Sequence, residues 1–343
     1  MSRRSLTLII AGIATLIAIV VSVLVPVPYV ILQPGPTLNT LGEVSGKPLI
    51  TITGRKTYST TGNLNMVTVG YQGGPGDNIN IWTALRAWID PSEAVVPEQE
   101  LFPSGQSEQE TQQQDTQEMT GSQQTATAAA LHQLGIGYQT QVSVAAVESG
   151  YPAEGVLKAG DVIEAVDGTT VTNETVLTNL ITSHPAGTKL RLTVLRNGAT
   201  EQLDVTTKES SGRPVVGVEV TENYKFPFNV SISVGDIGGP SAGMMFALGI
   251  IDKLTADNLT GGKFIAGTGE ITDTGQVEAI GGIQQKMVGA RDAGATVFLA
   301  PASNCTDVDG HVPGGLRIVK VSTLSQAMTY LQDIKADKPV PSC

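Results

Sequence analysis

The feature that most constrains this chain is an unbroken run without a charged residue from Leu6 to Val25. A helix rises about 1.5 Å per residue, so a run of about 20 residues matches the hydrocarbon thickness of a bilayer. Arg3 and Arg4 precede the run, and basic flanks stay on the cytoplasmic side. We therefore expect residues 1–5 to be a cytoplasmic tip and residues 6–25 a single transmembrane anchor in the cell membrane, with the rest extracytoplasmic. A cleaved signal peptide is the alternative, but its apolar stretch is usually shorter and ends at a small-residue cleavage site.

Composition excludes several classes of protein. The chain has 343 residues, enough for about two globular domains. Apolar residues make up 41% and charged residues 15%, which is too apolar for a disordered chain. The formal net charge of −11 repels phosphate backbones, so we expect no nucleic-acid partner. With three histidines, two cysteines and no HExxH motif, we expect neither a metal nor another cofactor.

The two cysteines, Cys305 and Cys343, are a candidate disulfide. Paired thiols are commonly oxidised outside the cell, and this bridge would tie the C-terminal tail to the last domain. Two unpaired thiols are the alternative, because the sequence does not give the distance between them.

The region after the anchor divides in two. Apolar and polar residues alternate in Leu64–Val69, which predicts a strand, and Ile81–Ile89 predicts a short helix. Residues 99–124 are rich in glutamine with few apolar anchors, and no lysine or arginine occurs from Ala87 to Leu157. We expect residues 91–130 to be an acidic, Gln-rich connector that is solvated and partly flexible, a plain spacer rather than a functional tether.

Residues 131–210 change character and predict short strands at regular spacing, with a helix over Asn173–Ser183. Three motifs resemble a PDZ domain of the bacterial protease-associated type: Leu-Gly-Ile at 134–136, Gly-Asp-Val-Ile at 160–163 and Val-Asp-Gly at 166–168. The resemblance implies that an extended peptide adds a strand to the domain. Its terminal carboxylate would be received by backbone N–H groups at Leu134, Gly135 and Ile136. A PDZ-like fold that only spaces or gates its neighbour is the alternative.

A serine in the last third of the chain stands where a helix is expected to begin. Phe228–Val234 alternates as a strand, a glycine-rich turn follows, and helix formers come after Gly243. Pro240 suits a first helical turn, because its missing N–H would have no partner there. Ser241 is therefore expected at a helix N-terminus, where unpaired N–H groups and the helix dipole favour an oxyanion.

A serine hydroxyl needs a base to act as a nucleophile, and Lys286 is the candidate. Residues 281–291 predict a helix with an apolar stripe, and Lys286 falls on that stripe between Ile283 and Ala290. Burial disfavours the charged form of lysine and lowers its pKa, so the amine can accept a proton. A lysine that reaches water from the edge of the stripe is the alternative.

Ordered motifs around these two residues closely resemble the proteolytic domain of Lon-type proteases: Pro-Ser-Ala-Gly at 240–243, Gly-Thr-Gly-Glu-Ile at 267–271, Ile-Gly-Gly-Ile at 280–283, and Gly-Ala at 294–295. The resemblance implies Ser241 as nucleophile and Lys286 as general base. Thr268 matches the family threonine that hydrogen-bonds the lysine, and Gly239 and Pro240 belong to the supporting loop.

One position departs from the family pattern. The family carries an acidic residue three positions before the serine, where this chain has Gly238. Asp236 lies two positions further upstream and is kept as a supporting candidate, with its contribution open.

The order of anchor, PDZ domain and this domain resembles the membrane-anchored, PDZ-containing Lon-like serine proteases of Gram-positive bacteria. The expected fold class is α+β, with an N-terminal transmembrane helix, a small β-rich PDZ domain and an α+β Lon-type proteolytic domain. The PDZ domain is an insertion in that family, so we assign residues 26–90 together with 211–335 to the proteolytic domain. Residues 336–343 are expected to be a C-terminal tail.

The expected function is that of an ATP-independent serine endopeptidase with a Ser-Lys dyad. The sequence has no G-x-x-x-x-G-K-[ST] motif and thus no phosphate-binding loop for a motor. We expect limited cleavage of exported peptides or flexible protein segments, selected with help of the PDZ domain. The resemblance also leaves a homo-oligomer open.

The sequence leaves two alternative functions open. One is a non-catalytic, membrane-tethered PDZ adaptor. The other is an α/β-hydrolase in which Gly239–Gly243 is a nucleophile elbow served by Asp292 or Asp307 and by His311.

Overall fold

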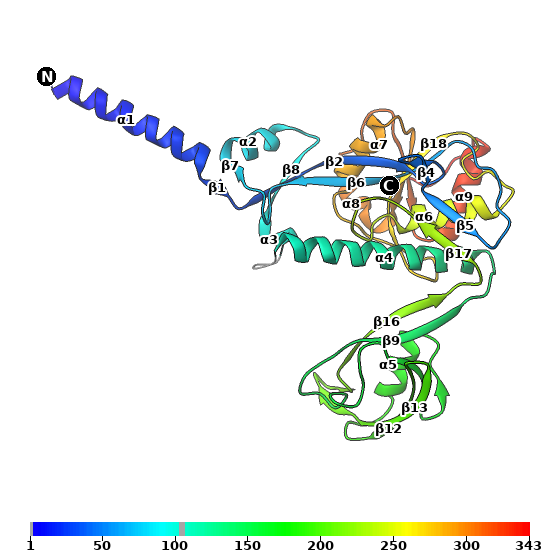
Figure 1. Cartoon of the computed structure of the whole chain (residues 1–343). Coiled ribbons are helices and arrows are strands. Elements are labelled where there is room, and N and C mark those ends of the chain that lie inside the picture. The colour runs from blue at the N-terminus through cyan, green and yellow to red at the C-terminus, as the bar shows by residue number, and fades with distance from the viewer. Residues whose placement is uncertain (1–2, 103–106) are drawn as a thin grey trace. The chain divides into compact units, whose positions relative to one another are not determined.

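The computed structural model describes residues 3–102 and 107–343. The chain divides into two compact units (Figure 1). The first combines the chain up to Gly135 with Phe228–Cys343, and the second is Ile136–Pro227, inserted between the two parts of the first. The α+β fold class is confirmed, because helices and strands are mixed along both units.

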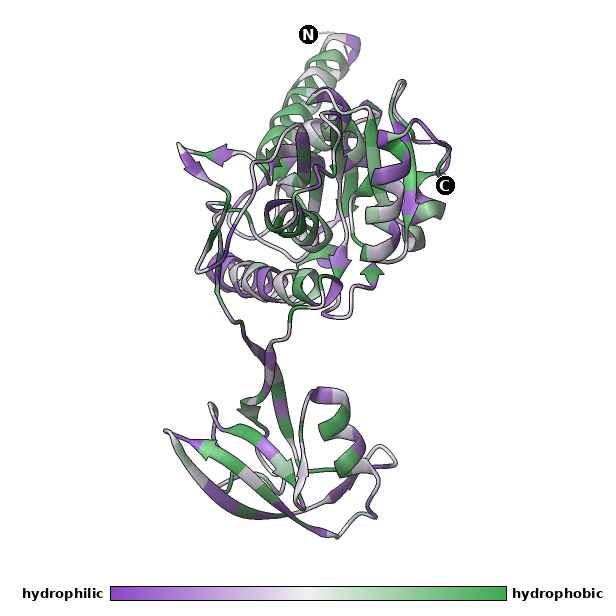
Figure 2. Ribbon diagram, turned by 90° about the vertical axis from the view of Figure 1, so that its right-hand side faces the viewer, coloured by the Kyte–Doolittle hydropathy of each residue, from purple (hydrophilic) through white to green (hydrophobic). Residues whose placement is uncertain are grey.

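The first unit begins with helix α1 (Arg3–Leu24). Among the described residues, α1 is the one helix whose length and apolar composition would allow it to cross a membrane, and none of its residues is buried. Figure 2 colours it hydrophobic along most of its length.

A six-stranded sheet forms the centre of the first unit, in the order β22-β21-β18-β6-β2-β8. Its strands are β2 (Tyr29–Asn39), β6 (Asn63–Gln72), β8 (Ala94–Pro97), β18 (Phe264–Gly267), β21 (Val297–Pro301) and β22 (Arg317–Val321). β6 pairs in parallel with β18, so segments before and after the inserted unit build one sheet. Every residue of β21 is buried, as expected for a parallel strand covered on both faces.

Helices cover both faces of this sheet. Alternate residues of β21 separate into two apolar clusters, with Leu299 in one and Phe298 in the other. Helix α6 (Gly243–Leu254) belongs to the cluster of Leu299, and helix α7 (Ile283–Asp292) belongs to that of Phe298. The turn that precedes α6 holds Ser241 and α7 holds Lys286, so the two catalytic candidates are positioned by helices on opposite faces of the sheet.

The predicted connector over residues 91–130 is wrong in part. Residues Glu108–Gln133 form one helix, α4, which starts with a capping box of Ser107 and Glu110. Small and apolar side chains in its second half are buried on α6, among them Ala126, Ala129 and Ala130. The sequence did not indicate this buried helix face, because the first half of α4 is polar and the alanines of its second half give only a weak apolar pattern. Alanines nevertheless allow two helices to pack closely.

The boundaries of the second unit also differ from the expected 131–210. β16 (Val218–Lys225) pairs with β9 (Gln139–Val147) along its whole length, so the closing strand belongs to the inserted unit. The first unit resumes at Phe228, whereas residue 211 was expected to follow the inserted domain.

The second unit has a sheet in the order β13-β12-β10-β9-β16, with β11 paired to β10. Helix α5 (Glu174–Thr182) packs over it and buries Leu177 and Ile181. The other strands are β10 (Val162–Val166), β11 (Thr169–Thr170), β12 (Lys189–Arg196), β13 (Ala199–Thr206), β14 (Lys208–Ser210) and β15 (Arg213–Val215).

The remaining elements belong to the first unit. They are β1 (Pro26–Val27), β3 (Glu43–Val44), β4 (Lys47–Pro48), β5 (Ile50–Thr53), β7 (Ile79–Asn80), α2 (Ile81–Ile89), α3 (Glu98–Leu101), β17 (Asn229–Ile232), β19 (Glu270–Ile271), β20 (Val277–Glu278), η1 (Ala302–Asn304), α8 (Cys305–Val308) and α9 (Leu324–Lys335).

Candidate active site

Ser241 lies in the turn between β17 and α6. The helix begins at Gly243 with Ala242 as its N-cap, so Pro240 and Ser241 precede the first turn rather than form it. The carbonyl oxygen of Ser241 accepts hydrogen bonds from the N–H of Gly269 (2.8 Å) and from Oγ1 of Thr268 (2.9 Å). These two bonds fix the backbone of the serine.

The first N–H groups of α6 are already used. The N–H of Gly243 donates to Pro240 O (3.4 Å) and that of Met244 donates to Gly269 O (3.0 Å). The N–H groups of Ser241 and Ala242, in contrast, have no acceptor within residues 3–102 and 107–343. An oxyanion beside Ser241 would therefore find its donors in this turn rather than in the helix.

Lys286 comes from one turn inside α7, and its side chain is only 3% exposed. Its Nζ donates to Oγ of Ser241 at 2.7 Å and to Oγ1 of Thr268 at 3.2 Å. Burial lowers the pKa of Lys286 from 10.5 to about 8, and the nearby carboxylate of Glu270 opposes that shift. The amine is thus placed to exchange a proton with the serine hydroxyl near neutral pH.

Thr268 is fully buried and bridges the two candidates. Its hydroxyl donates to the carbonyl of Ser241 and accepts from Lys286. One side chain therefore fixes both the backbone of the serine and the head of the lysine.

Asp236 lines the same cleft as Ser241 but is exposed, and it has no hydrogen bond to Ser241 or Lys286. A different acidic residue, Asp115 of α4, lies against the turn that leads to Ser241, which we call the serine loop (residues 238–241). Its backbone oxygen accepts from the N–H of Gly239 at 3.1 Å. A Cβ added at Gly238 would lie 2.4 Å from the Cβ of Asp115, so α4 occupies the space of a side chain at residue 238.

Asp115 was not among the residues predicted from sequence, because it lies within residues 91–130, which were expected to be a partly flexible connector. A signal for its helix was present, since Ser107 followed three residues later by Glu110 is a capping-box pattern. Ser122, about two helical turns after Asp115 on α4, also reaches the serine loop, where its hydroxyl donates to Pro240 O at 2.9 Å.

The cleft around Ser241 has a volume of about 700 Å³ and a strongly acidic lining. Lys286 is the one basic residue among its described lining residues, whereas the acidic ones are Glu100, Asp115, Glu118, Asp236 and Glu270. Burial raises the pKa values of Asp115 and Glu270, and the neighbouring Glu118 adds to both shifts.

The residues of the α/β-hydrolase alternative do not reach this cleft. His311 and Asp292 are absent from the described lining of the cleft, and Asp307 accepts a hydrogen bond from Asn304 instead. In the part of the chain that the structure describes, no cluster of His, Cys, Asp or Glu side chains could hold a metal ion.

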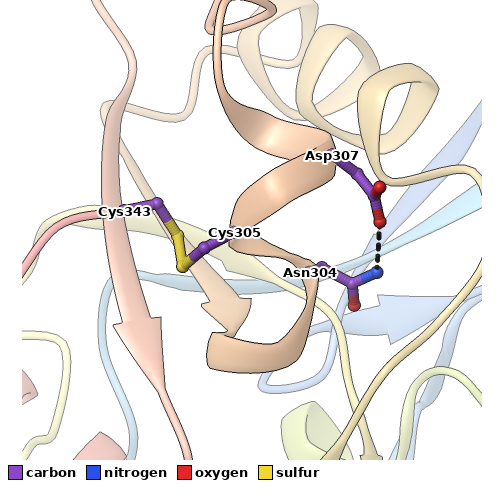
Figure 3. The surroundings of a disulfide bond; sticks show 4 residues. All are labelled: Asn304, Cys305, Asp307 and Cys343. Carbon is purple, nitrogen blue, oxygen red and sulfur yellow. Dashed lines mark hydrogen bonds between the residues drawn. A yellow bond between two sulfur atoms is a disulfide. The ribbon is translucent and has the colours of Figure 1, made fainter.

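Cys305 and Cys343 are joined by a disulfide, with their Cα atoms 5.1 Å apart (Figure 3). The bridge ties the tail to α8. Beside it, Asn304 exchanges two hydrogen bonds of 2.9 Å with the backbone of Ile280, just before α7. The disulfide therefore braces the segment that leads to Lys286.

The second unit has a groove of about 610 Å³ at a place the sequence analysis did not predict. It lies between α5 and residues 214–220, which include the first part of β16, the edge strand of the sheet. Leu134, Gly135 and Ile136 are not among its described lining residues, because Leu134 caps α4 and packs on the core of the first unit. The three residues that the sequence suggested for peptide binding in the PDZ domain therefore do not line the groove.

Comparisons with known proteins agree with this arrangement. Residues 220–332 match the model of the Lon protease (S16) C-terminal proteolytic domain, and residues 112–207 match that of the PDZ domain. The PDZ match begins inside α4, whereas the compact unit begins at Ile136. The fold and the site thus define a protein that joins a PDZ domain to a protease domain. Within residues 220–332 this chain is similar to the proteolytic domain of Lon proteases.

The similarity to individual relatives is confined to one domain. The chain is 35% identical over 106 residues to a Lon protease of Neorickettsia sennetsu, and 31% identical over 120 residues to Lon protease 1 of Bacillus subtilis. These matches cover 30% and 34% of this chain, but only 12% and 15% of the relatives. A crystal structure of the PDZ domain of an SdrC-like protein from Listeria monocytogenes is 27% identical, covering 23% of this chain and 85% of that one, with a TM-score of 0.22.

Proposed function

We propose that this chain is a membrane-anchored serine endopeptidase in which Ser241 is the nucleophile and Lys286 the general base. The observation that carries the proposal is the contact of 2.7 Å between Nζ of the buried lysine and Oγ of the serine. A neutral amine at this distance can take the hydroxyl proton as Oγ attacks a peptide carbonyl.

The chemistry then follows from the surrounding groups. The attack gives a tetrahedral oxyanion, for which the N–H groups of Ser241 and Ala242 are the nearest unused donors in the turn. The protonated Lys286 returns its proton to the leaving amine, and an acyl-enzyme remains on Ser241. A water molecule, deprotonated by the same amine, hydrolyses the ester and restores the serine. Thr268 keeps the lysine aimed at Oγ throughout.

We propose limited proteolysis outside the cytoplasm rather than bulk degradation. The basic flank Arg3 and Arg4 supports a cytoplasmic N-terminus, and with α1 spanning the membrane the residues after α1 lie on the other side. The sequence has no phosphate-binding loop, so this chain supplies no motor to unfold stable substrates. Exported peptides and flexible segments fit an open cleft served by the PDZ unit.

The groove between α5 and β16 supports a role in substrate selection. β16 pairs with β9 on one side, and no strand of the described chain pairs with its other edge. Leu177, Ile181 and Val216 give the groove an apolar floor. An extended peptide could add to this edge by backbone hydrogen bonds, with its side chains on the floor.

Turnover of an unstructured protein by the full chain in detergent tests the catalytic proposal. We expect wild type to cleave, and Ser241→Ala and Lys286→Ala each to lower the rate by roughly 10³-fold or more. Ser233→Ala, on the strand side of the same loop, is a control for loop damage. Equal and negligible turnover by wild type and Ser241→Ala would leave a peptide-binding adaptor instead.

A further inference from the structure

Helix α2 exposes its large apolar side chains and buries its small ones. Its inward face consists of Ala84 and Ala87, which pack against Ile31 and Ile79. Its outward face holds Trp82, Leu85, Trp88 and Ile89, and the last two are 76% and 83% exposed. Burying small alanines and exposing two tryptophans is the reverse of ordinary core packing.

The position of α2 is tied to the end of α1. The chain leaves α1 at Leu24, and the next strand, β1, pairs with β7, which leads directly into α2. Pro26 lies opposite Asn80, and the Asn80 side chain caps α2 through the N–H of Thr83 at 3.0 Å. The first turn of α2 is therefore held beside the last turn of α1 (Figure 1).

A side-chain contact fixes the same relation. Nε1 of Trp82 donates to Oγ of Ser22, near the end of α1, at 2.9 Å. If α1 spans the bilayer, Ser22 lies at the membrane boundary, where tryptophan is the preferred side chain. Arg86, on the same side of α2, is ion-paired with Glu93 and can reach lipid phosphates at this level.

We propose that α2 is an interfacial helix that lies on the bilayer in which α1 is anchored, with Trp82, Leu85, Trp88 and Ile89 inserted among the lipids. An amphipathic helix of this kind sinks about 5–10 Å into the boundary between headgroups and acyl chains. This second contact would hold the proteolytic unit on the membrane surface. The inference rests on the proposed anchoring by α1 but not on the proposed catalysis.

The two tryptophans of α2 are the only ones in the chain, so tryptophan emission reports this helix alone. The full chain with Trp82→Phe, which leaves Trp88, is reconstituted into vesicles of phosphatidylcholine and phosphatidylglycerol. We expect lipids brominated near the carbonyl end of the acyl chain to about halve its emission, with weaker quenching by lipids brominated near the chain end. Emission that brominated lipids leave unchanged and aqueous iodide quenches would overturn the proposal.

A matched control places tryptophan elsewhere on the same unit. Tyr58 lies in the exposed loop after β5, which is drawn at the opposite end of the unit from α1 (Figure 1). Tyr58→Trp in a chain with Trp82→Phe and Trp88→Phe should respond to iodide and not to brominated lipid.

Two further readouts separate the competing outcomes. Resistance to alkaline carbonate extraction shows in the same samples whether α1 spans the membrane. If the chain resists extraction but lipid bromination leaves Trp88 unquenched, the interfacial position of α2 is contradicted and the anchor is not. If carbonate extracts the chain, both the anchor and the interfacial position are contradicted. A second copy of the chain covering the face would shield Trp88 from iodide without any effect of lipid bromination. That result would also overturn the proposal.

Discussion

Nζ of Lys286 lies 2.7 Å from Oγ of Ser241, although 45 residues separate them in the chain. Ser241 lies in the turn before α6 and Lys286 lies in α7, and these two helices cover opposite faces of one sheet. Thr268, directly after β18, forms hydrogen bonds with both residues. Burial lowers the pKa of Lys286 to about 8 although the carboxylate of Glu270 opposes the shift, so the neutral amine is accessible near neutral pH.

The rate of cleavage should depend on pH through Lys286. The base is active when neutral, so kcat/KM should rise about tenfold per pH unit below the pKa and level off above it. The turning point should lie near the pKa of about 8. Stopped assays on a flexible peptide between mildly acid and alkaline pH measure it.

Glu270→Gln tests whether the pH dependence comes from Lys286. The carboxylate of Glu270 raises the pKa of Lys286, so its removal should move the profile toward lower pH. A profile that stays in place, or that is flat in both proteins, would contradict Lys286 as the base.

Restoring an acidic side chain at residue 238 should damage this protein. A Cβ at Gly238 would lie 2.4 Å from that of Asp115, so Gly238→Asp must push α4 away from the serine loop. We expect a lower melting temperature and weaker cleavage, with recovery of both when Asp115→Gly is added. Gly121→Ala, which has open space around its Cβ on α4, should be tolerated. An undamaged Gly238→Asp protein would show that α4 is not held against the loop.

The acidic lining of the cleft should favour basic substrates. Asp115, Glu118 and Glu270 line the cleft, and the one basic side chain near them among the described lining residues is Lys286. We expect peptides with lysine near the scissile bond to have kcat/KM about tenfold higher than glutamate counterparts, less so at high salt. Asp115→Asn with Glu118→Gln should reduce the ratio. Equal rates for both peptides would rule out selection by charge.

The disulfide should matter for stability more than for chemistry. It closes a loop with a sequence separation of 38 residues, far from Ser241 in the chain. Cys343→Ser should lower the free energy of unfolding by about 2–4 kcal/mol. Denaturant titration without reductant measures the loss, with Ser342→Ala as the neighbouring control. If both variants unfold alike, the bridge is not formed in solution.

Filling the groove of the second unit should block peptide capture. Thr178 lies on the exposed side of α5 and lines the groove. Thr178→Trp should weaken binding of peptides selected on the protein by phage display about tenfold or more. Thr200→Trp on β13, the strand at the other edge of the sheet, should bind as wild type does. Unchanged binding by Thr178→Trp would place the peptide site elsewhere.

Local features of this protein can be predicted from its amino-acid sequence. An uncharged run long enough to cross a bilayer, an apolar stripe containing Lys286, and strands with turn signals in the inserted unit are periodic patterns within one element. Such patterns follow the repeat of a helical or extended backbone. The helix or strand can therefore be predicted without knowing which other elements pack against it. The ordered Lon-type motifs added the pairing of serine and lysine.

The contacts between segments that lie far apart in the chain become visible in the folded protein. The tertiary structure joined β6 to β18 across the inserted unit, brought Asp115 to the space beside Gly238, and moved the groove from Leu134–Ile136 to the edge of β16. These relations depend on contacts between residues far apart in the chain. Such contacts produce no periodic pattern in the sequence of either segment. The alanines of α4 show why, because their value lies in close packing against α6 rather than in a strong apolar pattern of their own.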